Sequence, residues 1–168
     1  MRKVADKVGV TAPAIYRHFR GKDELLDEII LSGLVILEEY LKPAFDAPTP
    51  FERLNGLIDR YLAFALEQPR YFEFAFLVPG RPIGRFSEEI AKHGWETFRF
   101  ALEQVSLCID QGVFRRDDPQ EIAVLVWAEV HGLVTLFKME RLGPDPDRFR
   151  VTYQRAVKRL LEGLKSPS

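Results

Sequence analysis

Residues 4–19 read VADKVGVTAPAIYRHF, which is a helical segment, a glycine and a second helical segment. The first segment begins near residue 1, and Gly9 is a natural residue to end it because glycine adopts left-handed backbone angles without strain. Thr11 then caps a second short helix, which holds Pro13 in its first turn and runs to Phe19. The sequence therefore predicts two short helices joined by a tight turn, the arrangement of a helix-turn-helix.

The two faces of this motif carry different side chains. Ala5 is small enough to let two helices approach closely, and the expected inner face is apolar: Val4, Val8, Val10, Ile15 and Phe19. The outer face, at the start of the second helix, carries Thr11, Ala12, Pro13 and Tyr16. In a helix-turn-helix this end enters the major groove of DNA.

Polar groups around the second helix are placed to reach phosphates. Tyr16, His18 and Lys22 lie on or just behind it, and Thr11 stands at its N-terminus, where backbone amides also favour an anion. The charge distribution agrees: residues 1–22 hold six basic side chains and one acidic one, whereas the rest of the chain holds 18 basic and 24 acidic ones. A basic end on an acidic body is expected when only that end meets a polyanion, although many short basic segments are simply solvated.

The rest of the chain shows helical periodicity, with apolar residues recurring at intervals of three and four. The expected helices cover residues 23–42 (capped by Asp23), 51–67, a segment from Pro69 that stops at 78–80, 86–111 (capped by Ser87), 119–141 and 146–164, with 43–50 as a linker. The single cysteine, Cys108, lies in an apolar helical stretch, which favours a buried structural thiol over a redox sensor. The predicted fold class is all-α: a helix-turn-helix head followed by a larger helical domain.

The N-terminal motif resembles the signature of TetR-family repressors. The resemblance rests on Ala5-Asp6, Gly9-Val10-Thr11, Tyr16-Arg17-His18-Phe19 and Lys22-Asp23-Glu24-Leu25-Leu26, in this order and spacing. It implies a DNA-binding region over residues 1–26 and a helical ligand-binding and dimerisation domain over 27–168. It also implies that Tyr16, His18 and Lys22 contact the DNA backbone, and that Thr11, Ala12 and Pro13 lie nearest the bases. The alternative for these residues is a generic helical hairpin with a glycine turn.

Two stretches of the body resemble one branch of the same family more loosely. Residues 68–76 look like its aromatic helix, and Trp127-Ala128-Glu129-Val130-His131-Gly132-Leu133 looks like the Trp/His-Gly helix for which its domain is named. We expect a pocket for a small apolar or aromatic effector, lined by Tyr61, Phe64, Phe74, Phe98, Leu102, Trp127 and His131. For each of these residues a place in the core is the alternative, and His131 is the sharpest case, because a histidine on an apolar helix is often a hydrogen-bonded core residue. His93 is a weaker candidate for the mouth of the pocket.

The segment 119–141 is apolar on nearly all sides, so it must be covered on two faces. One face can pack in its own domain, and the other can meet a second copy of the chain, with the last helix beside it. The expected interface residues are Val126, Leu133, Phe137, Tyr153, Val157 and Leu160. Two heads in a homodimer can also read successive major grooves about 34–36 Å apart. The alternative is a monomer with a thick core.

Other classes of protein have less support in the sequence. No nucleophile–base pairing, phosphate-binding loop or Glu-x-x-His pair indicates an enzyme or a metal centre, so we expect no cofactor and no metal. No signal peptide or membrane-spanning run is apparent, and we expect a cytoplasmic protein without a membrane partner. The partners expected are operator DNA, a small-molecule effector and a second copy of the chain. A helical ligand-binding or protein-interaction module without DNA binding is the remaining alternative.

The resemblance also exposes a difference at the N-terminus. TetR-type heads have three helices before the long connecting helix, whereas this sequence starts inside the second of them. A further helix with its lead-in would take roughly 20–30 residues. Without it Val4, Val8 and Phe19 lose a packing partner, so we expect residues 1–168 by themselves to bind operator DNA poorly.

Overall fold

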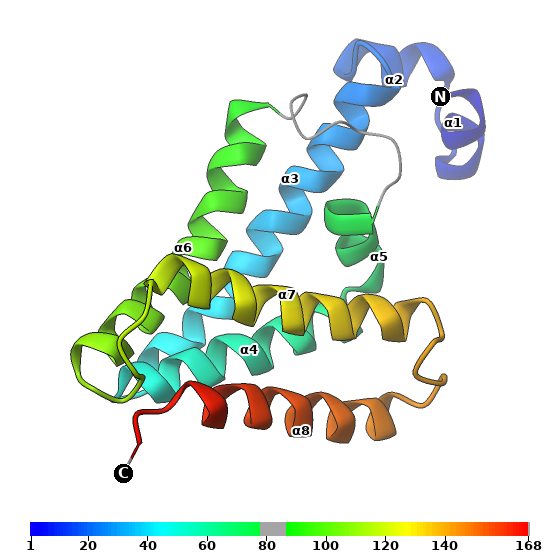
Figure 1. The fold of residues 1–168 in the computed structure, drawn as a ribbon. Helices are drawn as coiled ribbons and strands as arrows, with labels where there is room; N and C mark the ends of the chain where they lie inside the picture. The colour runs from blue at the N-terminus through cyan, green and yellow to red at the C-terminus, as the bar shows by residue number, and fades with distance from the viewer. Residues whose placement is uncertain (78–86, 168) are drawn as a thin grey trace.

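The computed structural model describes residues 1–77 and 87–167, and these are helical nearly throughout (Figure 1). The helices are α1 (Arg2–Val8), α2 (Ala12–His18), α3 (Lys22–Leu41), η1 (Lys42–Asp46), α4 (Pro50–Glu67), α5 (Pro69–Phe72), η2 (Glu73–Leu77), α6 (Glu88–Asp110), α7 (Pro119–Lys138) and α8 (Pro146–Leu164). No strand occurs in the described part of the chain, where Phe114 and Lys165 form an isolated bridge. The all-α prediction is confirmed. The predicted stop at 78–80 lies outside the described residues.

Half of these helices begin where the sequence places a capping side chain. The hydroxyl of Thr11 accepts from the amide of Ala14 at 3.3 Å, and Gly9 ends α1 with a φ of 73°. Ser87, Asp118 and Asp145 cap α6, α7 and α8 in the same way. Each cap satisfies backbone amides that have no partner within the helix, so these starts depend only on neighbouring residues.

Two local predictions were wrong. Helix α3 begins at Lys22 with Gly21 as its cap, and Asp23 instead lies in the first turn, where its charge suits the helix dipole. The expected linker 43–50 contains the 3-10 helix η1, in which Pro43 stands in the first turn. Proline has a backbone angle suited to a first helical turn, so proline content alone did not indicate an irregular segment here.

The long helix α3 connects the two parts of the molecule. Figure 1 shows α1 and α2 at one end of α3, with the other end entering the helical body. There α3 packs against α4, α6 and η2, while α7 packs against α4, α6 and α8. The core of the body includes Leu54, Phe64, Phe72, Val105 and Cys108, all of them buried. The expectation of a buried thiol is confirmed, and burial raises the pKa of Cys108 to about 11.

Helix α8 is held to the body by two aromatic side chains. Phe149 stacks on Phe137 of α7 with their ring centroids 4.2 Å apart, and the hydroxyl of Tyr153 donates to the backbone carbonyl of Ile58 in α4 at 3.1 Å. Both Phe149 and Tyr153 are buried within the chain. The inner face of α8 is therefore part of the core of one protomer.

The substitution Tyr153→Phe tests this hydrogen bond. It should lower the free energy of unfolding by about 1 kcal/mol, because one buried hydrogen bond is lost while the ring remains. The control Tyr16→Phe, on the exposed surface of α2, should change it by no more than about 0.5 kcal/mol. Urea unfolding followed by circular dichroism measures both, and equal stability of the two variants would contradict the assignment.

Candidate functional site

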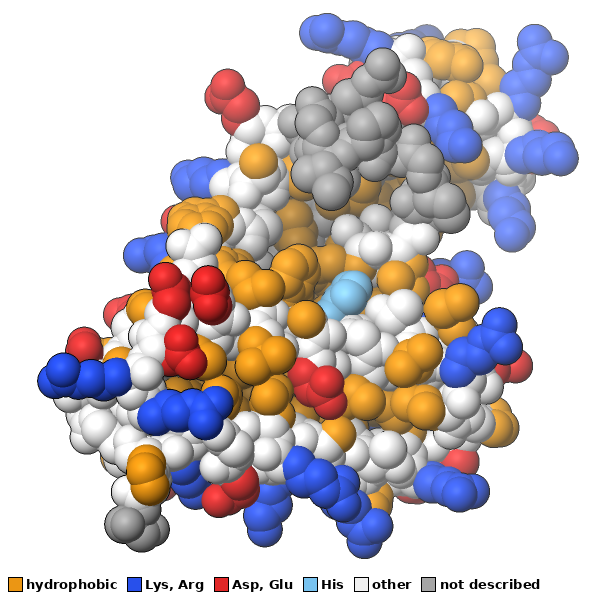
Figure 2. All heavy atoms as spheres, viewed as in Figure 1, with side chains coloured by type: hydrophobic (Ala, Val, Ile, Leu, Met, Phe, Trp, Pro, Cys, Tyr) orange, Lys and Arg blue, Asp and Glu red, His pale blue; other side chains and the backbone are white. Residues whose placement is uncertain are grey.

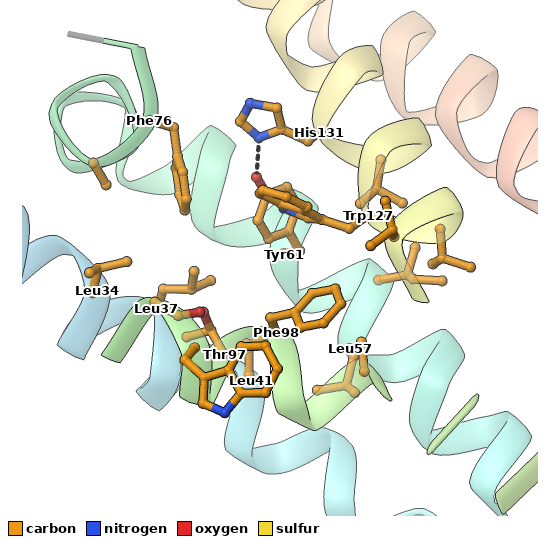
Figure 3. Close-up of a pocket in the computed structure, with 18 of the residues that line it drawn as sticks. Leu34, Leu37, Leu41, Leu57, Tyr61, Phe76, Thr97, Phe98, Trp127 and His131 are labelled. Atoms are coloured by element: carbon orange, nitrogen blue, oxygen red, sulfur yellow. Dashed lines mark hydrogen bonds between the residues drawn. The ribbon is translucent and has the colours of Figure 1, made fainter. Parts of the chain in front are cut away.

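A cavity of about 760 Å³ lies between α3, α4, η2, α6 and α7. Helix α3 contributes Ile30, Leu34, Leu37 and Leu41, spaced four, three and four residues apart so that they share one face. The opposite walls are aromatic, and Figure 3 shows Tyr61, Phe76, Phe98 and Trp127 around the same space. The described lining residues include no Asp, Glu, Lys or Arg side chain. This is the composition of a site for a small apolar molecule.

The cavity is open on one side. The rings of Trp95 and Trp127 line it, yet these residues are 52% and 45% exposed. On the face drawn in Figure 2, apolar side chains gather in the hollow between α6 and α7. The wall at η2 is a short π-helix, a form frequently found at functional sites.

One polar pair stands in this apolar lining. The hydroxyl of Tyr61 lies 2.7 Å from Nδ1 of His131 (Figure 3). Burial raises the pKa of the Tyr61 hydroxyl far above its ordinary value, an effect that the nearby Trp127 indole N–H offsets only in part, and burial lowers the pKa of His131. Both groups are therefore neutral at pH 7. The rings of Phe72, Phe76 and Trp127 surround His131, with centroids 5.8, 5.4 and 5.8 Å away.

The head presents a polar surface on α2 and at the residues that flank this helix. Thr11, Pro13, Tyr16, His18 and Lys22 are all exposed, and Ala12 is partly exposed. Ala5 and Ile15 are buried where α1 and α2 meet. The prediction that Val4, Val8 and Val10 form an inner face was wrong for the described residues, since all three are exposed and Phe19 is half-buried. The described chain places no element over that side of α1.

Helix α7 also leaves an apolar face uncovered. Leu125, Leu136 and Met139 are 46%, 43% and 57% exposed, and Gly132 between them has open space beside it. By length and composition α7 could cross a membrane, but a core helix of a soluble protein passes the same test, so this is weak support for a span. Its other side packs on α4, α6 and α8.

Comparison with known proteins places this architecture in a family. Residues 1–29 match the profile of bacterial regulatory proteins of the tetR family, and residues 54–160 match that of the tetracyclin repressor-like C-terminal domain. The chain belongs to the TetR family. Among curated protein sequences, none matches it.

Several solved structures share the fold of this TetR-family chain. The TetR regulator PfmR from Thermus thermophilus is 22% identical with a TM-score of 0.77, and the match covers 98% of this chain and 88% of that one. A tetR-family regulatory protein from Rhodococcus is 19% identical with a TM-score of 0.79, covering 99% and 86%. A protein of unknown function, also from Rhodococcus, is 24% identical with a TM-score of 0.80, covering 98% and 84%. At these identities the likeness concerns the fold.

Against this TetR-family fold, the predicted ligand residues divide into two groups. Tyr61, Phe74, Phe98, Trp127 and His131 line the cavity. Phe64 and Leu102 are not among the described lining residues: Phe64 is fully buried beside the rings of Tyr40 and Phe72, and Leu102 packs against the core. His93 is also absent from that lining, because its Nδ1 pairs with a carboxylate oxygen of Glu38 on α3 at 2.5 Å. Whether the lining residues bind a ligand stays a prediction.

Sequence reasoning missed the contribution of α3 and of Trp95. The spacing of Ile30, Leu34, Leu37 and Leu41 was a usable signal, since it marks one apolar face, but it does not show whether that face meets a protein surface or a cavity. The described residues place no group of three His, Cys, Asp or Glu side chains where they could hold a metal ion.

Half of the predicted interface residues need correction. Val126, Tyr153 and Val157 are buried inside their own protomer and have little surface left for a partner, whereas Leu133, Phe137 and Leu160 are half-buried. Helix α7 is apolar on both sides, so composition could not tell its inner side from its outer one. The uncovered residues Leu125, Leu136 and Met139 were missed for the same reason.

Replacing His131 by glutamine should change how the free energy of unfolding depends on pH. The unfolded chain protonates His131 near its ordinary pKa of 6.5, whereas the folded chain resists protonation, so the free energy of unfolding falls as the pH drops through 6.5. The loss is at most about 1.4 kcal/mol per pH unit, the slope for one proton. Urea unfolding at pH 7.5 and 5.5 should show a smaller loss for His131→Gln than for the wild type. The control His18→Gln, on the exposed head, should keep the wild-type loss, and equal pH dependence in all three proteins would contradict the burial of His131.

Proposed function

We propose that this TetR-family protein is a transcriptional repressor in the cytoplasm that binds operator DNA as a homodimer and is released by a small apolar effector. The observation that carries the proposal is the double role of α3. Its N-terminal end follows the DNA-reading motif directly, and its inner face lines the cavity with Leu34, Leu37 and Leu41. A molecule that fills the cavity contacts the same helix that carries the head.

The proposed mechanism is a shift between two conformations of the protein, one with the heads placed for DNA and one with the heads displaced. An effector that prefers the body conformation with displaced heads lowers operator affinity by its differential binding to the two states. At the head, Thr11, Ala12 and Pro13 lie nearest the bases, while Tyr16, His18 and Lys22 contact phosphates. The hydroxyl of Thr11 accepts from the amide of Ala14, which leaves its own proton for a phosphate oxygen.

A second copy of the chain is the proposed occupant of the uncovered face of α7. The exposed apolar residues there are Leu125, Leu136 and Met139, with Val151 exposed on α8. Basic side chains gather along α8, at the lower edge of Figure 2, where Arg148, Arg155 and Arg159 are exposed. Helix α7 carries Glu121 and Glu129, so two copies related by a two-fold axis can bring opposite charges together around an apolar centre.

The variant Leu136→Glu tests the interface. Sedimentation at micromolar concentration should show a dimer for the wild type and a folded monomer for the variant, because two buried carboxylates would face each other near the axis. Val35→Glu places the same charge on an exposed apolar residue of α3 and should stay dimeric. A monomeric wild type, or equal dimerisation of the two variants, would sink the proposed interface.

DNA binding is tested by selection from a random DNA library. We expect the selected sites to be two-fold symmetric. Lys22→Ala should lower the dependence of log affinity on log salt concentration by about one for each lost phosphate contact. Lys42→Ala removes the same charge just beyond the other end of α3 and should leave this slope unchanged. If the selection enriches no sequence, the chain is a helical ligand-binding or interaction module.

A further inference from the structure

We propose that the effector is uncharged and largely apolar, and that it carries one hydrogen-bond acceptor, which binds the Nε2–H of His131. This inference names the ligand class of the cavity and rests on the effector-binding role proposed above. Two properties of the cavity support it: the hydrogen-bonding state of its polar pair and the absence of charge from its described lining.

The donor follows from the pair between Tyr61 and His131. Burial keeps the Tyr61 hydroxyl protonated and the His131 ring neutral. The hydroxyl therefore donates to Nδ1 across 2.7 Å, and a neutral ring that accepts at Nδ1 carries its proton on Nε2. Figure 3 draws Nε2 on the side of the ring away from Tyr61. No described residue accepts a hydrogen bond from it, although the ring lines the cavity.

The other polar groups of the described lining are engaged or lie at the rim. The hydroxyl of Thr97 donates to the backbone carbonyl of Gly94 at 2.9 Å. Gln120 and Trp95 are exposed at the open side. The indole N–H of Trp127 lies near the hydroxyl oxygen of Tyr61, where it partly offsets the rise in the pKa of Tyr61 that burial causes. The Nε2–H of His131 is thus the donor left for a ligand.

The charge of the ligand follows from the walls. With no charged side chain in the described lining, an ionised ligand would lose its hydration without a counter-charge, which is costly.

The probes are straight-chain compounds that differ only in the end group. Both tryptophans of the chain, Trp95 and Trp127, line the cavity, so binding is followed by their fluorescence without any DNA. From hexanol to decanol the affinity should rise about fourfold per methylene, as for full burial of each group. Decanoate and decylammonium should bind at least tenfold more weakly than decanol. An equal or higher affinity for either ion would overturn the proposal.

The hydrogen bond is tested by the ratio of the affinity for decanol to that for decane. The double variant Tyr61→Phe/His131→Phe keeps both aromatic rings but removes the donor together with the Tyr61 hydroxyl that would otherwise be freed to replace it. It should lower this ratio roughly threefold to tenfold, as expected for one hydrogen bond. Thr97→Val removes another hydroxyl from the same cavity, one already bonded to Gly94, and should leave the ratio unchanged. Because a loosened cavity weakens both probes alike, the ratio isolates the donor. An unchanged ratio in the double variant would overturn the assignment.

This experiment separates the ligand class from the proposed regulatory role. If decanol binds with the expected ratio but never releases the protein from DNA, the proposed function fails and the ligand class stands. If no probe changes the tryptophan fluorescence or gives heat in titration calorimetry, the ligand class is wrong, whatever the protein does on DNA.

Discussion

Helix α3 is an unbroken rod of 20 residues, and the arrangement of both parts of the molecule depends on it. Its length is about 30 Å, which carries it from the head into the middle of the body. Ile30, Leu34, Leu37 and Leu41 are buried along one side, where apolar contact with α4 and α6 fixes the helix in place. Gly33 allows close contact with α5 and η2, since an added Cβ there would lie 3.3 Å from the carbonyl oxygen of Tyr71. A displacement of α4, α6 or η2 would therefore also displace α3, the helix that carries the head.

The polar pair beside α3 costs little stability because the Tyr61 hydroxyl and Nδ1 of His131 bond to each other. A buried hydroxyl or imidazole without a partner would cost a substantial part of the stability of a small domain. Their hydrogen bond offsets this cost, and burial among the rings of Phe72, Phe76 and Trp127 lowers the pKa of His131 and keeps the imidazole neutral. The same arrangement leaves a single directional donor in an otherwise apolar space.

Head and body differ in how fully their apolar surface is covered. In the body Phe64, Phe72 and Tyr153 have almost no exposed surface, whereas in the head Val4, Val8 and Val10 remain exposed and Ala5 and Ile15 form a very small core. An uncovered apolar face also runs along α7. Such faces are uncommon on isolated soluble domains and are typical of surfaces that meet another element or another chain.

The sequence by itself determined most of the helices and the family. Thr11, Thr49, Ser87, Asp118 and Asp145 cap the helices they precede, because a cap involves only the next few residues, and the motif over residues 1–26 was recognisable for the same local reason. Only the tertiary structure decided which apolar side chains face the cavity, the core or the outside. Tyr61 and Phe64 are three residues apart on α4, yet one lines the cavity and the other is fully buried; Val126 and Leu125 are adjacent, yet one is buried and the other exposed. These differences depend on where helices far apart in sequence leave space between them, which no local pattern records.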